Sequence, residues 1–220
     1  MQRSEDSAVD RNISDIAAML LNAHRCHTAI LYGSHAHGEP TPGSDYDVAG
    51  FANVNSIERI AGPWRNSYLD IFIHPESALS KPTAELLSLR GGVVLFQQND
   101  RGDSFLRQLD QIYARGPDAL PKSEKHARRI WAWKMLDRAS REDAEGNFRR
   151  AWLLTALLED YFHLRGKWYE GPKRSLRYLM ESEPSLHAKF EAALQPGTDL
   201  LAIATVVEAV VGPRLGECDV

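Results

Sequence analysis

The chain has 220 residues, of which 43% are hydrophobic and 25% are charged, and its formal net charge is −4 at pH 7. This composition is typical of a globular protein and excludes a disordered chain, and the length allows one large domain or two small ones. The negative charge argues against a nucleic-acid partner. We expect neither a membrane span nor a signal peptide, because no apolar run is long enough and the first residues are acidic and polar. The two cysteines, Cys26 and Cys218, do not form a disulfide framework, which favours a cytoplasmic protein.

The first part of the chain predicts a helix, a strand and a turn. Apolar residues recur at helical spacing over residues 10–25, which predicts a helix. The apolar run 28–32 then predicts a short strand, and the pair Gly33-Ser34 predicts the turn that ends it. Glycine at this turn lets the backbone approach a phosphate closely, because it has no Cβ. If a short helix begins at Ser34, its free N–H groups add a second means of binding phosphate.

Two acidic residues, Asp45 and Asp47, follow this turn, and ten residues separate Asp45 from Ser34. Residues 45–51 predict a second strand, in which residues two apart face the same way. The two carboxylates therefore project together, and two like charges held side by side usually share a cation. Carboxylate oxygens are the ligands that Mg²⁺ prefers.

A third acidic residue, Asp70, lies between two apolar residues in a strand predicted over residues 67–73. The Gly-Ser turn, the Asp-x-Asp pair and this later acidic residue together resemble the nucleotidyltransferase superfamily that includes DNA polymerase β and the antibiotic nucleotidyltransferases. The resemblance implies an α/β (α+β) catalytic domain with a small mixed sheet, extending to about residue 115. It also implies that Asp45, Asp47 and Asp70 are catalytic and hold two Mg²⁺ ions, and that the protein binds a nucleoside triphosphate such as ATP.

Some assignments within this domain stay open. Asp70 could instead be an edge-strand residue, in which case Glu58, Asp100 or Asp103 would be the third ligand. Ser44 could bind phosphate or stabilise the turn that precedes the acidic pair.

Two histidines, His35 and His37, lie in the loop after the turn. We interpret them as variable loop residues, because a Zn²⁺ site would need more nitrogen or sulfur ligands. Residues 56–66 contain Gly62-Pro63 and predict an irregular connection. Residues 84–90 predict a short helix, and residues 93–96 a further strand.

The segment Arg115–Pro121 contains two prolines and a glycine and predicts a domain boundary. It separates a nucleotidyltransferase domain, residues 1–116, from a helical C-terminal domain, residues 122–220. The second half shows no convincing strand pattern, and helical spacing in five stretches predicts an all-α helical bundle. The five stretches are residues 123–140, 144–165, 173–181, 184–194 and 198–211.

The segment Arg165–Arg177 combines five cations with two aromatic residues. It resembles a segment of relatives with a helical second domain, where a lysine reaches the triphosphate, and the resemblance assigns this role to Lys173. The alternative is a solvated basic start of a helix. Glu159 and Asp160 could attract a cationic acceptor, act as a general base or be ordinary surface acids. We interpret the basic run Lys122–Arg141 as a solvated helix face.

The favoured hypothesis is therefore a Mg²⁺-dependent nucleotidyltransferase that acts on a hydroxyl of a small-molecule acceptor, in the manner of the antibiotic nucleotidyltransferases. The alternative is an antitoxin-like or regulatory nucleotidyltransferase that modifies or binds a protein partner. The residues do not identify the acceptor, the triphosphate, the general base or the oligomeric state.

Overall fold

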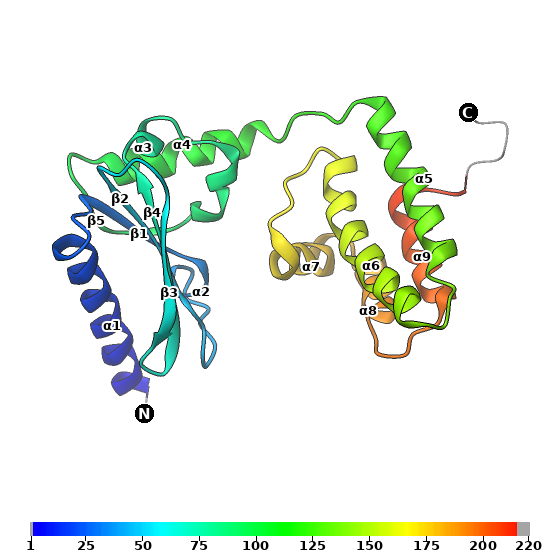
Figure 1. Ribbon diagram of the computed structural model, residues 1–220, viewed down its shortest axis with the longest axis horizontal. Coiled ribbons are helices and arrows are strands. Elements are labelled where there is room, and N and C mark those ends of the chain that lie inside the picture. The colour runs from blue at the N-terminus through cyan, green and yellow to red at the C-terminus, as the bar shows by residue number, and fades with distance from the viewer. Residues whose placement is uncertain (1, 215–220) are drawn as a thin grey trace. The chain divides into compact units, whose positions relative to one another are not determined.

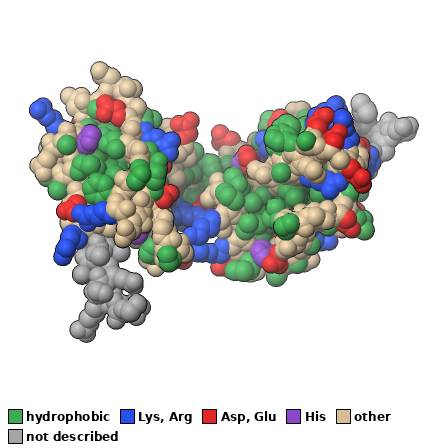
Figure 2. Space-filling view, turned by 60° about the horizontal axis from the view of Figure 1, so that its bottom comes forward, with side chains coloured by type: hydrophobic (Ala, Val, Ile, Leu, Met, Phe, Trp, Pro, Cys, Tyr) green, Lys and Arg blue, Asp and Glu red, His purple; other side chains and the backbone are tan. Residues whose placement is uncertain are grey.

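A computed structural model describes residues 2–214, with side chains from residue 11 onward. The chain divides into two compact units at Arg115 and Gly116. Within the described range, no helix combines the length and the apolar character that crossing a bilayer requires. On the face shown in Figure 2, basic and acidic side chains lie among one another on both units.

The first unit is a mixed five-stranded sheet with helices on both faces (Figure 1). The strands are β1 (Thr28–Tyr32), β2 (Tyr46–Ala52), β3 (Glu58–Trp64), β4 (Ser67–Pro75) and β5 (Val93–Phe96). The helices are α1 (Gln2–Asn22), α2 (Gly33–Ala36), α3 (Ser77–Ser80), the 3-10 helix η1 (Ala84–Leu89) and α4 (Arg101–Arg115). The strand order is β3-β4-β2-β1-β5, with β2 and β4 parallel and the other neighbours antiparallel. The predicted small mixed sheet is confirmed.

Strict alternation along the strands produces two cores, one on each face of the sheet. On one face, buried strand residues such as Val48 and Ile71 pack with Ile16 and Leu20 of α1. On the other face, Ile30, Ala49 and Phe51 pack with η1 and with Phe105 and Leu109 of α4. Val48 and Ile71 are on the α1 face, so their sequence neighbours at positions 47 and 70 are on the α4 face.

Strand β3 corrects the prediction of an irregular connection over residues 56–66. Gly62-Pro63 does not break the strand, because β3 is at the edge of the sheet, where a proline is tolerated. A two-residue turn, Arg65-Asn66, joins β3 to β4, and Arg65 adopts a left-handed conformation with φ +55°.

The described residues of the second unit contain helices and no strand. The helices are α5 (Lys122–Arg138), α6 (Ala144–Leu164), α7 (Gly171–Ser182), α8 (Pro184–Ala193) and α9 (Leu200–Val211). Leu153, Leu157 and Tyr161 lie on one face of α6 and are fully or almost fully buried in a core to which α5, α7, α8 and α9 also contribute. Helix α6 begins where the side chain of Asp143 accepts a hydrogen bond of 2.8 Å from the Gly146 amide, a typical N-cap.

Candidate active site

Three side chains form a row across the sheet at one end of β2 and β4. Tyr32 of β1 is in register with Asp47 of β2, and Asp47 is in register with Asp70 of β4. All three belong to the face that carries α4, because strand residues alternate between faces. Neighbouring strands lie roughly 4.8 Å apart, so the two carboxylates are held side by side by backbone hydrogen bonding. The strand pairing thus brings together two of the three predicted ligands.

The electrostatics of Asp47 show how crowded this row is. The pKa of Asp47 rises from 3.8 to about 6, first because the carboxyl is partly buried and then because Asp45 and Asp70 repel its charge. The pKa of Tyr32 is also raised, first by burial and then by the charges of Asp47 and Asp70. The ionised forms of these groups are therefore disfavoured in the protein alone, and a cation placed among them would reverse this.

Asp45 lies outside the strand in which the sequence placed it. Strand β2 begins at Tyr46, and Asp45 is an exposed residue of the preceding loop. Only one sequence neighbour of Asp45 is apolar, because Ser44 precedes it and Tyr46 follows it. The pairing of β2 with β4 begins one residue later, at Tyr46. Asp45 nevertheless raises the pKa of Asp47, so its carboxylate lies near the row.

Asp70 has a partner that the sequence did not predict. Arg59 of β3 donates two hydrogen bonds to its carboxylate, from Nε to Oδ1 at 2.8 Å and from Nη2 to Oδ2 at 2.9 Å. The guanidinium also lies over the ring of Phe72, 5.0 Å from its centroid. A bidentate pair of this kind occupies both oxygens of the carboxylate, so Arg59 and a metal ion would compete for Asp70.

Arg59 was missed because the segment that contains it was interpreted as a connection. The sequence signal for a strand here is a two-residue alternation, in which positions 58, 60 and 62 belong to one face and Arg59 and Ala61 to the other. In β3 the second group is on the face of Asp70, since Ala61 is in register with Asp70.

The alternative third ligands lie elsewhere. Glu58 contributes to the raised pKa of Cys26, a residue of the α1-side core, and therefore lies on the opposite face from Asp47. Asp100 and Asp103 follow β5, which ends at Phe96. Phe96 pairs with the second residue of β1, and Tyr32 is the last residue of β1, so both acidic residues follow the opposite end of the sheet from Tyr32. Asp70 is also not an edge-strand residue, because β4 lies between β3 and β2.

Gly33 is required at its position for two reasons. Its φ of +72° is a left-handed conformation that side chains rarely adopt, and a Cβ on this residue would collide with Oδ2 of Asp47. The Asp47 carboxylate therefore packs directly against the glycine backbone. The short helix α2 begins here, one residue before the predicted start at Ser34, and the carbonyl of Ser34 accepts a hydrogen bond of 3.0 Å from the Glu39 amide.

Ser44 has a role in the loop. Its hydroxyl accepts a hydrogen bond of 2.8 Å from the Thr41 amide and lies 3.0 Å from the Thr41 hydroxyl, which stabilises the turn before Asp45. His35 stacks on Tyr46, with ring centroids 4.1 Å apart, and its Nε2 lies 3.2 Å from the Ser44 carbonyl. His35 thus contributes to the structure of the loop, and phosphate binding by Ser44 stays a prediction.

Within residues 11–214, no group of three or more His, Cys, Asp or Glu side chains is arranged to hold a metal ion as it stands. The pair between Arg59 and Asp70 gives a reason for this, because it directs both oxygens of Asp70 to the guanidinium. The donor set itself suits Mg²⁺: Asp45 and Asp47 are hard oxygen ligands, and the raised pKa of Asp47 marks a site where a cation would be stabilised. Asp70 would join them if Arg59 moved away.

Lys173 belongs to the second unit, in the first turn of α7, and its side chain is exposed. Asp160 of α6 is buried and forms an ion pair with Arg128 of α5, which also pairs with Glu124 at 2.8 Å. A buried carboxylate held by an arginine stabilises the contact between two helices, so we assign Asp160 a structural role rather than that of a general base.

Glu159 and Asp160 line a cavity of about 340 Å³ between α5 and α6, together with Trp131 and Trp152. The two indole rings meet edge to face, with centroids 5.4 Å apart. Arg128, which pairs with Glu124 and Asp160, lines the same cavity, so its positive charge opposes the binding of an organic cation there.

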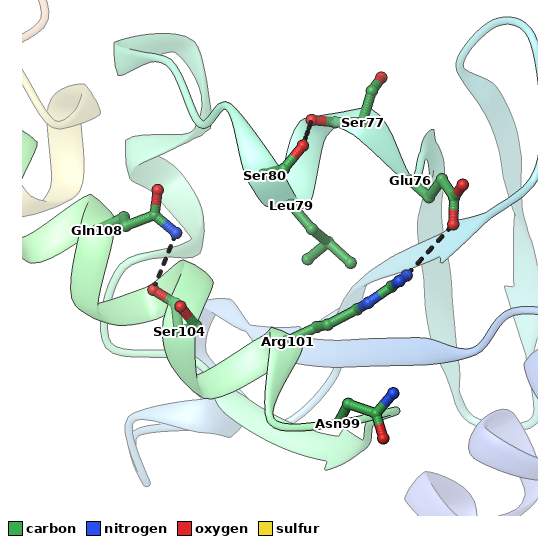
Figure 3. Close-up of a pocket in the computed structure, with 8 residues that line it drawn as sticks. All are labelled: Glu76, Ser77, Leu79, Ser80, Asn99, Arg101, Ser104 and Gln108. Carbon is green, nitrogen blue, oxygen red and sulfur yellow. Dashed lines mark hydrogen bonds and ion pairs between the residues drawn. The ribbon is translucent and has the colours of Figure 1, made fainter.

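A larger cavity of about 660 Å³ lies at the opposite end of β4 from Asp70 (Figure 3). Glu76, immediately after β4, and Arg101 of α4 point toward one another there and form an ion pair of 3.3 Å. Asp70 and Glu76 are six residues apart along an extended strand, a distance of roughly 20 Å. This cavity is thus separate from the carboxylate row, and its charged groups already pair with one another.

No protein-family model matches the chain, and no curated protein matches it. A search of solved structures matched the crystal structure of a nucleotidyltransferase-like protein from Exiguobacterium sibiricum 255-15. The two chains are 10% identical, the match covers 85% of this chain and 71% of that one, and the TM-score is 0.41. Function is therefore inferred from the residues of the site.

Proposed function

We propose that the chain is a Mg²⁺-dependent nucleotidyltransferase that transfers a nucleoside monophosphate from a nucleoside triphosphate to a hydroxyl of a small-molecule acceptor. The observation that supports this most is the position of Asp47 between Asp45 and Asp70, because burial and then the repulsion of these two charges raise its pKa to about 6. Asp47 is half-buried beside two further carboxylates, so its ionised form is disfavoured unless a cation joins the group.

In the proposed reaction the acceptor oxygen forms a bond to the α-phosphorus while the bond from that phosphorus to the bridging oxygen breaks. Pyrophosphate leaves, and the hydroxyl proton passes to a base, for which Asp70 is the candidate in this row. When bound, Mg²⁺ would neutralise the charge that grows on the phosphate oxygens. Asp45 and Asp47, joined by Asp70 once Arg59 has moved away, would hold the metal, and the backbone of Gly33, which has no Cβ, lets the Asp47 carboxylate lie directly against it.

In this proposal, metal binding is accompanied by a movement of Arg59. Its pair with Asp70 neutralises one carboxylate of the free protein. Metal binding would require the guanidinium to leave Asp70, after which the arginine could pair with a phosphate oxygen of the substrate. Arg59 is exposed and on an edge strand, so little packing opposes this movement.

The same ion pair is the observation that favours the alternative. A chain whose third carboxylate is held by arginine could use this fold to bind or modify a protein partner as a regulatory or antitoxin-like nucleotidyltransferase. In a chain that only binds a partner, the pair would persist in the presence of Mg²⁺ and triphosphate.

Incubation with labelled ATP, GTP, CTP or UTP and Mg²⁺ tests the proposal. The acceptor panel contains aminoglycosides, lincosamides, transfer RNA and a protein lysate. We expect label on a small molecule, of which a cationic antibiotic is the first to test. Label on one protein band would support the regulatory alternative, and no label with any acceptor would contradict catalysis.

A further inference from the structure

The second unit contains a cavity of about 550 Å³ lined almost entirely by basic and apolar side chains. Its walls are the N-terminal half of α5 and the C-terminal ends of α6 and α9. The charged and titratable residues that line it are Lys122, Lys125, His126, Arg129 and Arg165, and none of the acidic residues among positions 11–214 lines it. Positions 122, 125, 126 and 129 recur at helical spacing and therefore share one face of α5.

The cations that line the cavity differ from Arg128, on the adjacent face of α5, in their ion pairing. Arg128 is neutralised by Glu124 and Asp160. Within the described part of the chain, the side chains of Lys122, Lys125 and Arg129 form no ion pair and no hydrogen bond, and the buried Nε of Arg129 is without an acceptor.

Arg129 is the strongest indication of a ligand. Its Nε is buried and has no hydrogen-bond partner among residues 11–214. The guanidinium packs against Gly212, where a Cβ would lie 2.6 Å from Nη2. A buried guanidinium N–H without an acceptor costs free energy, which a bound anion would recover by drawing the guanidinium away from Gly212 into the cavity.

The position of the two lysine charges on α5 adds a further free-energy cost in the unliganded protein. Lys122 and Lys125 lie in the first turn of the helix, where the macrodipole disfavours cations. Arg165 is placed differently. It lies after the end of α6, and its guanidinium donates to the backbone carbonyls of Tyr161 at 3.3 Å and Val210 at 3.5 Å, so the dipoles of α6 and α9 favour it.

We propose that this cavity binds a small molecule that carries a di- or triphosphate group. Lys122, Lys125 and Arg129 supply three positive charges that no described acidic residue neutralises, and these match the charge of such a group. Arg129 offers a planar fork for two phosphate oxygens, and the two lysines follow the outer phosphates as point charges. The site uses none of the residues of the carboxylate row and is independent of the proposed transfer reaction.

Isothermal titration calorimetry with tripolyphosphate, in low salt and without divalent cations, tests this site on the full chain. We expect wild-type protein to bind, and Arg129→Gln and Lys125→Gln each to weaken the affinity by about tenfold or more, the usual effect of losing a charged hydrogen bond. Titration with ATP and with inorganic phosphate distinguishes a nucleotide from a free polyphosphate as the source of the phosphate group.

Lys134→Gln is the matched control, because Lys134 is an exposed lysine of the same helix that does not line the cavity. Its affinity should equal that of wild type. Absence of binding to wild type, equal weakening in Lys134→Gln, or unchanged affinity in Arg129→Gln would each overturn the proposal. Thermal unfolding of each variant checks that it is folded.

Discussion

The carboxylate row of the first unit and the basic cavity of the second each gather side chains of one charge, but they are neutralised differently. In the row, Arg59 already pairs with Asp70, and the remaining repulsion appears in the raised pKa of Asp47. In the cavity, Arg129 has no partner in the described part of the chain, and its Nε is buried. A ligand of the row must therefore displace a protein group, whereas a ligand of the cavity need not. Metal binding should be coupled to a rearrangement in the first unit alone.

The largest effect should come from removing the carboxylate of Asp47 or that of Asp45, which lies near the row. Asp45→Asn or Asp47→Asn should reduce nucleotidyl transfer by orders of magnitude, because both lose a charged metal ligand while the side-chain volume is kept. Asp118→Asn makes the same change at an exposed carboxylate of the segment between the two units. Turnover assays should show full activity in that control, and turnover near wild type in either active-site variant would remove it from the metal site.

A smaller loss should come from Lys173. If it holds the triphosphate, Lys173→Ala should weaken nucleotide binding by about 1–3 kcal/mol, the usual range for a charged hydrogen bond. Calorimetry with a non-hydrolysable triphosphate measures this. Unchanged affinity would assign Lys173 to the solvated surface of α7.

Arg59 tests the difference between the two regions. In Arg59→Gln no guanidinium competes for Asp70, so Mg²⁺ alone should bind several-fold more tightly than to wild type. Lys81→Gln, a change of one exposed cation in the same unit, should leave Mg²⁺ affinity unchanged. Equal Mg²⁺ affinity in Arg59→Gln and wild type would mean that the ion pair does not oppose the metal.

The smallest effect concerns stability and pH. The pKa of Asp47 is higher in the folded protein, about 6, than the ordinary 3.8 that the unfolded chain is expected to have. The folded state therefore binds a proton more readily, so the free energy of unfolding should fall as the pH rises from about 4 to about 6. Since the carboxyl is only half-buried, the loss should be about 1 kcal/mol, less than the full shift would give.

In Asp47→Asn, the free energy of unfolding measured in urea should lack the pH dependence that Asp47 causes. The variant should be more stable than wild type at pH 7.5 in the absence of Mg²⁺, and the difference should shrink toward pH 4. A difference that is the same at both pH values would mean that Asp47 is not perturbed by its neighbours.

The sequence predicted the carboxylate row because strand alternation is a local property. The spacing of Asp45 and Asp47 and the apolar residues beside Asp70 placed the acidic residues on predicted strands. Alternation also gives the face of each side chain once a strand is assigned. The parallel register of β2 and β4, which places Asp47 beside Asp70, depends on packing between distant segments and has no local signal.

Two features of the row were outside the reach of local patterns. The start of β2 at Tyr46 instead of Asp45 depends on where pairing with β4 begins. The assignment of Arg59 failed because proline was treated as a strand breaker, which it is not at a sheet edge. Only the finished sheet shows that β3 is at the edge.

The basic cavity illustrates the opposite case. Lys122, Lys125, His126 and Arg129 have a visible helical spacing that predicts a solvated face, and the first three are indeed exposed. What makes a cavity of that face is the packing of the ends of α6 and α9 beside it. Helix periodicity predicts which residues share a face but not what lies opposite them.

Calorimetric titration of Mg²⁺ with a non-hydrolysable nucleoside triphosphate tests the central claim most directly. The comparison is between wild type, Asp47→Asn and the control Asp118→Asn, at pH 7.5 and again at pH 5.5. We expect Mg²⁺-dependent binding to wild type and the control, release of protons at pH 5.5 because Asp47 is partly protonated there, and loss of both signals in Asp47→Asn. Mg²⁺-dependent binding with the same affinity and the same proton release in Asp47→Asn would contradict the assignment of the carboxylate row as the metal site.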